Sequence, residues 1–204
     1  MDPKKEKLLM YALPLLIVAV FVLLRSGPGI LSVNKALALS AVVVLGITFI
    51  IGPLSKFIKV MNRGKLYRKY LGLSAFAIII VHIVISILFY YNADIARILD
   101  LSSSSMPQVY SGLIAFAIFF LMTVTSAKEA IKVLGGRNWK LIQNTGYIAM
   151  ALVMLHFMLA NTVSGELRIN HVYTMIAFAF GIIIILARIF VLILVHIEKS
   201  SMKK

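Results

Sequence analysis

The sequence predicts an all-α integral membrane protein: a six-helix transmembrane bundle with both termini in the cytoplasm. Hydrophobic residues make up 61% of the 204 residues, against about 45–50% in soluble domains. They gather in runs close to the roughly 20 residues that a helix needs to cross a bilayer. Charged residues are only 14% of the chain and fall mainly between these runs. We therefore expect residues 1–204 to form a single transmembrane domain in the cell membrane, with the lipid bilayer as its main partner.

Six apolar runs are predicted to be the membrane spans. In chain order they are Leu8–Leu24, Leu37–Leu54, Tyr70–Tyr91, Gly112–Ser126, Gly146–Val163 and Val172–Ile197. The first also has the basic start of a signal peptide, but Ala36-Leu37-Ala38 lies too far downstream for a good cleavage site. The fourth is short and is expected to extend into its flanks. The sixth is long and is expected to tilt or to project into the cytoplasm.

The segments between the spans are predicted to be loops. The longest outer connector, 92–110, contains Ser102–Ser105 and Pro107, which favour turns. The basic segment 128–140 is interpreted as a loop with a turn at Gly135-Gly136. None of the predicted spans has the pattern of an amphipathic surface helix.

Orientation follows from the positions of Lys and Arg. Sixteen of the 21 cations lie in the N-terminal segment, in segments 56–69 and 128–140, and at the C-terminus, whereas the opposite loops hold four. Because cytoplasmic loops are enriched in Lys and Arg, these four segments are expected to face the cytoplasm. The net charge of +14 is then explained by membrane topology, and no nucleic-acid partner is expected.

Two histidines lie inside predicted spans, His82 in the third and His156 in the fifth. Ionisable side chains at membrane depth are rare and by default mark a functional site. Both spans run from the inside to the outside, and, measured from their outer ends, His82 lies ten residues before Asn92 and His156 ten residues before Glu166. The two imidazoles are therefore expected at a similar depth. The simpler alternative is that each only hydrogen-bonds to a neighbouring helix.

A neutral imidazole is a common axial ligand of haem iron, so the pair indicates a haem site. The sequence has no cysteine, which excludes thiolate ligation and iron–sulfur clusters held by this chain. His171 and Arg188 are secondary candidates. His171, at the outer start of the sixth span, is interpreted mainly as an interfacial residue, and Arg188 as a residue whose side chain extends toward the cytoplasmic surface.

Several motifs around the histidines resemble those of the ferric reductase-like transmembrane superfamily. They are Gly52-Pro53-Leu54, Arg68-Lys69-Tyr70-Leu71-Gly72-Leu73 before His82, Thr125-Ser126, Leu134-Gly135-Gly136-Arg137-Asn138-Trp139-Lys140-Leu141, Tyr147 and Leu155-His156-Phe157. The resemblance covers about residues 36–163. Within that superfamily the likeness is greatest to the haem-binding membrane subunits of methionine-sulfoxide reductase systems.

The resemblance implies a membrane cytochrome b that passes electrons from the cytoplasmic side to an acceptor outside. His82 and His156 would be the axial ligands of its haem b iron. Related subunits usually carry another histidine thirteen positions before the second ligand, where this chain has Gln143. One haem is therefore favoured over two, with Gln143 as a secondary candidate for cofactor binding.

The sequence contains no G-x-G-x-x-G motif after a predicted strand, so a separate electron donor is expected. The candidates are a flavin reductase, a bound flavin such as FMN, and a membrane quinol. The expected acceptor is an extracytoplasmic reductase. One alternative is direct reduction of ferric or cupric ions at the outer face. Another is a small proton-coupled transporter or channel in which His82 and His156 relay protons.

Overall fold

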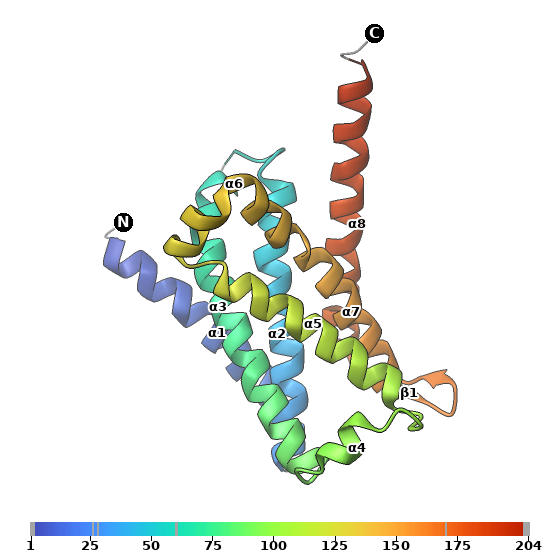
Figure 1. The fold of residues 1–204 in the computed structure, drawn as a ribbon. Helices are drawn as coiled ribbons and strands as arrows, with labels where there is room; N and C mark the ends of the chain where they lie inside the picture. Colours follow the sequence, from blue (N-terminus) through green and yellow to red (C-terminus); the bar gives the residue numbers. More distant parts are fainter. Residues whose placement is uncertain (1–2, 26, 28, 60, 170, 202–204) are drawn as a thin grey trace.

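The computed structural model describes residues 3–25, 27, 29–59, 61–169 and 171–201 (Figure 1). Most of the chain is helical. The elements, in order, are α1 (Pro3–Leu24), α2 (Ile30–Leu54), α3 (Met61–Ile85), the π-helix η1 (Ser86–Tyr90), α4 (Ile95–Leu99), α5 (Met106–Val124), α6 (Lys128–Asn144), α7 (Gly146–Ala160), β1 (Thr162–Val163), β2 (Glu166–Leu167) and α8 (Val172–Ser201).

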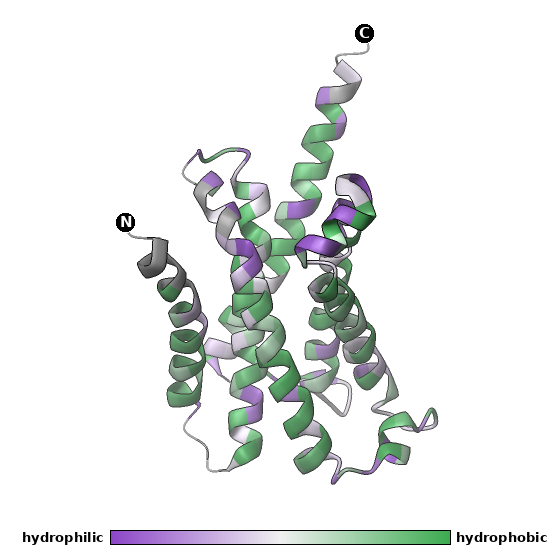
Figure 2. Ribbon diagram, turned by 60° about the vertical axis from the view of Figure 1, so that its left-hand side comes forward, coloured by the Kyte–Doolittle hydropathy of each residue, from purple (hydrophilic) through white to green (hydrophobic). Residues whose placement is uncertain are grey.

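Five helical segments among the described residues are long and apolar enough to cross a membrane: α2, α3 with η1, α5, α6 with α7, and α8. The first predicted span lies on α1, whose apolar part, Tyr11–Leu24, is shorter than the others. Figure 2 shows that the trunk of the bundle is mainly hydrophobic. The fold thus agrees with a multi-pass membrane protein, and the sixth crossing stays a prediction.

Helix α2 lies at the centre of the bundle. It packs on α1, α3 and α8, while α5 packs mainly on α7. In its most apolar window 67% of the residues are buried, compared with 17–22% in the other candidate spans, so only α2 is surrounded by protein. The fully buried side chains of Val44 and Phe49 on α2 meet Met150 on α7 and Ile184 on α8 in one core cluster.

Gly46 permits the close packing of α2 on α8. A Cβ atom built on Gly46 would lie 2.5 Å from side-chain atoms of Phe180 and Ile184. Small residues at helix interfaces let backbones approach closely, and dispersion contacts then hold membrane helices together.

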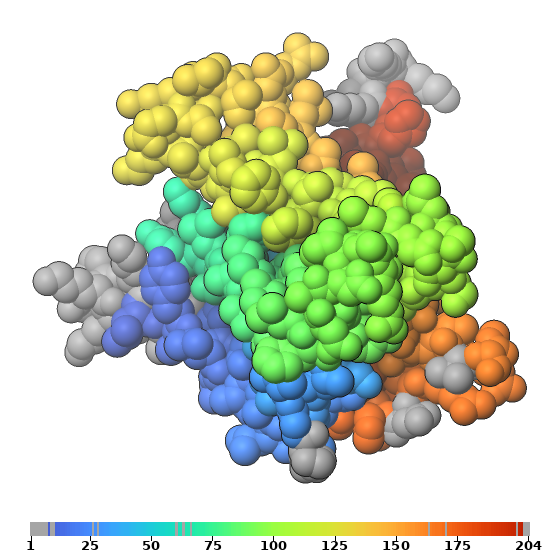
Figure 3. All heavy atoms as spheres, turned by 60° about the horizontal axis from the view of Figure 1, so that its bottom comes forward, coloured from blue at the N-terminus to red at the C-terminus, as the bar shows by residue number. Residues whose placement is uncertain are grey.

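The two ends of the bundle differ in character. The start of α1, the α2–α3 loop, α6 and the end of α8 lie in the upper part of Figure 1, and α4 and the β-hairpin lie at the lower end. Figure 3 views the lower end, where the green segment around α4 and the start of α5 covers the middle of the face. The antiparallel hairpin turns at Ser164 and Gly165, whose φ angles of 52° and 82° suit a tight two-residue turn.

The basic segment 128–140 was predicted to be a loop, and this prediction is wrong. The segment forms most of α6, a polar helix that spans Lys128–Asn144. At the predicted turn, Gly135-Gly136, the helix is kinked instead of ended: Gly135 has φ 71° and ψ 156° in the middle of α6. That backbone region is open almost only to glycine. Sequence analysis missed the helix because its apolar positions are few.

Candidate functional site

His82 lies on α3, one turn before η1, and its ring is held by Asn34 of α2. Its Nδ1 is 2.8 Å from Oδ1 of Asn34 and 3.2 Å from the Asn34 carbonyl oxygen. Nδ2 of Asn34 donates to Ser86 Oγ at 2.8 Å, and Ser86 donates to the His82 carbonyl oxygen. Both atoms near His82 Nδ1 are acceptors, so Nδ1 carries the proton. Nε2 then keeps its lone pair.

His156 lies on α7 and its ring is held by α5. Nδ1 of His156 is 2.7 Å from the carbonyl oxygen of Gln108, which can only accept, so this imidazole also donates from Nδ1. Gly112, one turn further along α5, makes room for the ring. A Cβ atom there would lie 2.8 Å from His156 Nδ1. The α5 backbone therefore fixes both the tautomer and the position of this imidazole.

The two imidazoles share the same chemistry. Both side chains are half-buried. Each donates from Nδ1 to an acceptor on another helix and keeps Nε2 available. This is the tautomer of a metal-ligating histidine whose other nitrogen is oriented by an outer hydrogen bond. The described residues contain no cluster of three or more His, Asp or Glu that could hold a metal ion by itself. Two imidazoles instead suit a metal whose remaining ligands come from a macrocycle.

The helices that carry the histidines make little direct contact with each other. Helix α3 packs mainly on α2, and α7 mainly on α5, while α3 and α5 touch. The ligand candidates therefore come from two helix pairs. This arrangement suits a flat group held between the pairs better than a direct histidine–histidine contact.

The secondary candidates lie elsewhere. His171 is exposed just before the start of α8 and stacks on Tyr173, with ring centroids 5.1 Å apart. Nε2 of Gln143 donates to the Met122 carbonyl oxygen at 3.1 Å, at the other end of the bundle. Arg188 donates to Asn144 Oδ1 at 3.3 Å, also toward that end. The structure thus brings none of these three side chains to the histidine pair.

Sequence analysis did not foresee the group of residues formed by Arg188, Arg68 and Tyr147. Its guanidinium lies over the ring of Tyr147, 4.7 Å from the centroid. Nε of Arg68 donates to the Thr48 carbonyl oxygen at 3.0 Å. The hydroxyl of Tyr147 donates to the Phe49 carbonyl oxygen at 3.1 Å. Pro53 has no N–H to bond that carbonyl within α2, so Tyr147 replaces the missing helical hydrogen bond.

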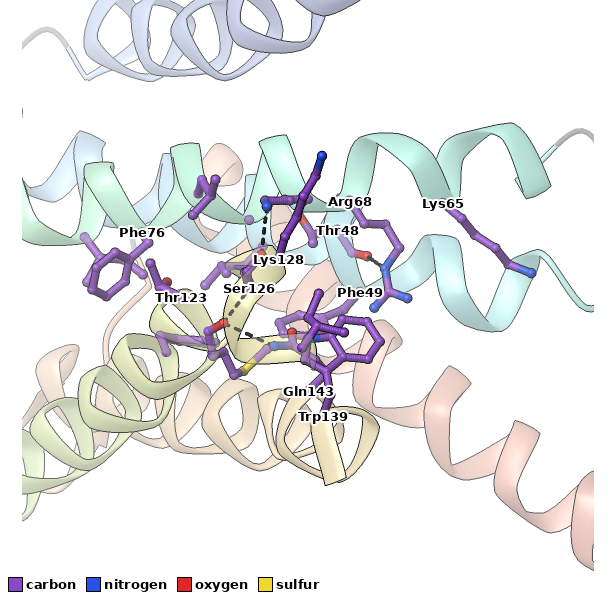
Figure 4. A pocket seen from close by; sticks show the side chains of 18 residues that line it. Thr48, Phe49, Lys65, Arg68, Phe76, Thr123, Ser126, Lys128, Trp139 and Gln143 are labelled. Atoms are coloured by element: carbon purple, nitrogen blue, oxygen red, sulfur yellow. Dashed lines mark hydrogen bonds between the residues drawn. The ribbon is translucent and has the colours of Figure 1, made fainter. Parts of the chain in front are cut away.

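A cavity of about 380 Å³ lies between α2, α3, α5 and α6 (Figure 4). Neither His82 nor His156 lines it. Its walls include Gln143, Arg68 and Trp139, so it lies toward the same end of the bundle as the basic segments. The cavity is therefore separate from the histidine pair.

Sequence analysis missed the residues that orient the histidines. Asn34 is polar, yet it stands just before the predicted start of the second span at Leu37, and α2 in fact begins at Ile30. A longer span would have placed an amide at membrane depth, which is a signal for function. Gln108 contributes only a backbone carbonyl, for which side-chain patterns carry no signal.

Comparisons with known proteins agree on one family. The pattern of the family described as "Ferric reductase like transmembrane component" matches residues 36–154. The chain is 31% identical to the magnetosome protein MamZ of Paramagnetospirillum magneticum over 135 residues, which is 66% of this chain and 21% of MamZ. The MamZ of Magnetospirillum gryphiswaldense is also 31% identical, over 137 residues, with 66% and 20% covered.

A third relative is the protein-methionine-sulfoxide reductase heme-binding subunit MsrQ of Polaromonas naphthalenivorans. It is 28% identical over 107 residues, which is 52% of this chain and 48% of MsrQ. The chain thus spans about a fifth of the length of the magnetosome proteins and about half of MsrQ.

Proposed function

Because the chain belongs to the ferric reductase-like transmembrane family, we propose that it is a membrane cytochrome b that carries electrons across the bilayer. The observation that carries this proposal is the matched pair of imidazoles, each with Nδ1 bound to a carbonyl-type oxygen and Nε2 available. One relative, MsrQ, is named as a haem-binding subunit. Nε2 of His82 and Nε2 of His156 would hold the iron of one haem b.

The protein holds and tunes this group through its own residues. Haem supplies the one-electron chemistry, and its axial ligands and their hydrogen bonds set its potential. The side-chain oxygen of Asn34 and the backbone carbonyl of Gln108 accept hydrogen bonds from the Nδ1–H groups of His82 and His156. These bonds fix the tautomers and make each Nε2 a stronger electron-pair donor to a metal. His82 from α3 and His156 from α7 would hold the group between them.

The direction of transfer rests on the proposed topology, with six spans and both termini inside. The start of α1 and the basic segments 56–69 and 128–140 lie toward one end of the bundle, which supports a cytoplasmic assignment for that end. The histidines stand nearer the other end, because α3 continues from His82 into the segment that leads to α4. We propose that electrons enter from a flavin reductase, a bound flavin or a quinol at the basic end.

The acceptor is proposed to lie outside the membrane. The likeness to MsrQ supports a periplasmic or other extracytoplasmic methionine-sulfoxide reductase as the acceptor. The second candidate is direct reduction of ferric or cupric ions, which the name of the family favours. Coupled assays of the purified protein, with a methionine-sulfoxide reductase or with ferric citrate, would separate the two.

The test of the haem assignment is a reduced-minus-oxidised spectrum with haem stoichiometry, measured on protein purified after expression with ample haem. We expect one haem per chain in the wild type and almost none in His82→Ala or His156→Ala. His171→Ala is the matched control and should keep its haem. A colourless wild type, or full haem content in either ligand variant, would refute the assignment. The alternative hypothesis, a transporter or channel in which His82 and His156 relay protons, would then be favoured.

A further inference from the structure

The segment 91–105, which we call the α4 cap, connects the two histidine networks at the end of the bundle opposite the basic segments. It follows η1, which begins at Ser86, the residue that donates to the His82 carbonyl oxygen. It ends at the start of α5, where the carbonyl oxygen of Gln108 accepts the hydrogen bond of His156. Helix α4 lies at the lower end of the bundle in Figure 1. The α4 cap therefore joins both imidazole networks directly to the surface at this end.

The α4 cap has a defined conformation. Asn92 and Ala93 have φ angles of 53° and 58°, so the chain turns sharply after Tyr91. Asp94 then caps α4, because its Oδ1 accepts from the backbone N–H of Arg97 at 3.0 Å. The guanidinium of Arg97 lies over the ring of Tyr91, 5.9 Å from the centroid. Left-handed backbone at residues other than glycine is uncommon and is found mainly at functional sites.

Apolar side chains are exposed on the α4 cap. Ile95 and Leu99 on α4, and Leu101 after it, are each more than half exposed. Ile95 and Leu99 are four residues apart and so lie on the same side of the helix. Figure 3 shows the segment around α4 in the middle of the end face, away from the sides of the bundle that lipid would surround. An apolar patch that faces water is typical of a protein-binding site.

The α4 cap also carries unpaired negative charge. Asp94 and Asp100 stand at the two ends of α4, and both are exposed. The hydroxyl and the backbone N–H of Ser102 donate to Asp100 Oδ1, and these hydrogen bonds lower the pKa of Asp100 from its ordinary value. Neither carboxylate forms an ion pair within the described ranges. With two Asp and one Arg, the α4 cap is net negative in a chain of net charge +14.

We propose that the α4 cap is the docking surface for a soluble electron-transfer protein whose contact surface is apolar and ringed by Lys and Arg. This inference rests on the proposed function and specifies how the acceptor is recognised. Ile95, Leu99 and Leu101 would contact the apolar centre of the partner, and Asp94 and Asp100 would attract the cations around it.

The size and charge of the α4 cap suit such a partner. Electron-transfer encounters bury less than about 1,200 Å² in total, so one short helix with its flanks offers enough surface. Complementary charges at the rim of a contact speed the encounter more than they strengthen the complex. A small ferric or cupric complex would leave the apolar side chains uncovered.

Cytochrome c is a suitable probe, because its exposed haem edge is apolar and ringed by lysines. Its binding to the full chain, held in phosphatidylcholine nanodiscs, would be measured by surface plasmon resonance at low ionic strength. This measurement needs no haem in the chain, so a failure of the haem assignment is distinguishable from a failure of docking. In haem-loaded protein reduced with dithionite, stopped-flow absorbance would then give the rate of electron transfer to cytochrome c. Ferricyanide, a small acceptor, serves as the comparison.

The variant Asp94→Asn/Asp100→Asn tests the charges without removing the caps. Asparagine keeps the Oδ1 acceptors that Arg97 and Ser102 use, and it is a good N-cap residue. We expect about tenfold weaker binding and an about tenfold lower bimolecular rate with cytochrome c, with the ferricyanide rate unchanged. Glu166→Gln is the matched control, because Glu166 lies on β2, outside the α4 cap, and it should behave like the wild type.

Salt should weaken the binding of cytochrome c to the wild type, because ions screen exposed charges. Ile95→Gln/Leu101→Gln should weaken it at every salt concentration. Binding that is independent of salt, or unchanged in Asp94→Asn/Asp100→Asn, would overturn the proposal.

A separate measurement distinguishes a protein partner from the bilayer as the occupant of this surface. The chain has no cysteine, so a fluorophore can be attached to Leu101→Cys alone. We expect iodide in the water to quench this fluorophore and nitroxide-labelled lipid to leave it bright. Quenching by the labelled lipid instead would place the α4 cap in the membrane and overturn the proposal.

Discussion

The side-chain oxygen of Asn34 lies 2.8 Å from Nδ1 of His82, and this contact joins α2 to α3. The same amide donates to Ser86, so both of its ends are engaged. Asn34 is buried, and a buried amide with both ends satisfied is held in one orientation. It can therefore hold the imidazole of His82 in one tautomer.

Asn34→Leu should weaken haem binding without preventing folding. The substitution removes the acceptor of the Nδ1 proton but keeps a similar volume in the bundle. Loss of such an outer partner typically lowers metal affinity by about 10–100-fold. Titration of haem-depleted protein with haemin, followed by absorbance, measures the effect. Ser40→Ala is the control, because Ser40 is buried on the same helix and bonds only to its own helix at Ala36. Equal haemin affinity in the wild type and Asn34→Leu would show that Asn34 does not contribute to haem binding.

Gly112→Ala should displace the ring of His156. The new Cβ would lie 2.8 Å from Nδ1 and 3.2 Å from Cε1 of His156, so the ring or α5 must move. We expect reduced haem content and a shifted midpoint potential in a redox titration. Gly72→Ala serves as comparison, since its Cβ would meet only Thr48 at an ordinary 3.7 Å. A normal spectrum and potential in Gly112→Ala would show that α5 does not position His156.

Tyr147→Phe should lower stability while the haem is retained. The variant leaves the Phe49 carbonyl without its hydrogen bond next to Pro53, at a cost of about 1–3 kcal/mol. A lower Tm in detergent, with an unchanged haem spectrum, is the expected result. Tyr110→Phe is the control, because its hydroxyl makes only a 3.5 Å contact on an exposed surface. A drop in Tm of the same size in both variants would contradict this account.

Gly135→Ala should disturb α6 and the surroundings of Trp139. At φ 71° and ψ 156° an alanine is strained by about 1–3 kcal/mol, so the kink should shift. A change in the emission maximum of Trp139 and a lower Tm would report it. In Gly136→Ala neither should change, because a Cβ at Gly136 meets nothing within 4 Å and its φ is ordinary. Identical emission in all three proteins would mean that the kink does not set the position of Trp139.

Most of the helical architecture was predictable because it depends on local properties of the chain. Long apolar runs predict helices, since every backbone polar group in a bilayer must be satisfied within the segment. The predicted spans at Tyr70–Tyr91 and Val172–Ile197 therefore agree closely with the apolar helical segments Tyr67–Tyr90 and Val172–Glu198, although α3 itself begins earlier, at Met61. The helix α6 was missed because its polar sequence has no long apolar run, and its position depends on packing against α5 and α7.

The sequence by itself determined that this is a helical membrane protein of the ferric reductase-like family, and it singled out His82 and His156. Composition, run length and motif order are enough for these conclusions, because each can be observed along a single chain. Only the tertiary structure decided that Asn34 and the Gln108 carbonyl orient the two rings, that Gly112 makes room for one of them, and that Trp139 shares a cavity with lysines from α3. These are relationships between helices far apart in sequence. Packing in three dimensions sets their distances, and no local pattern records it.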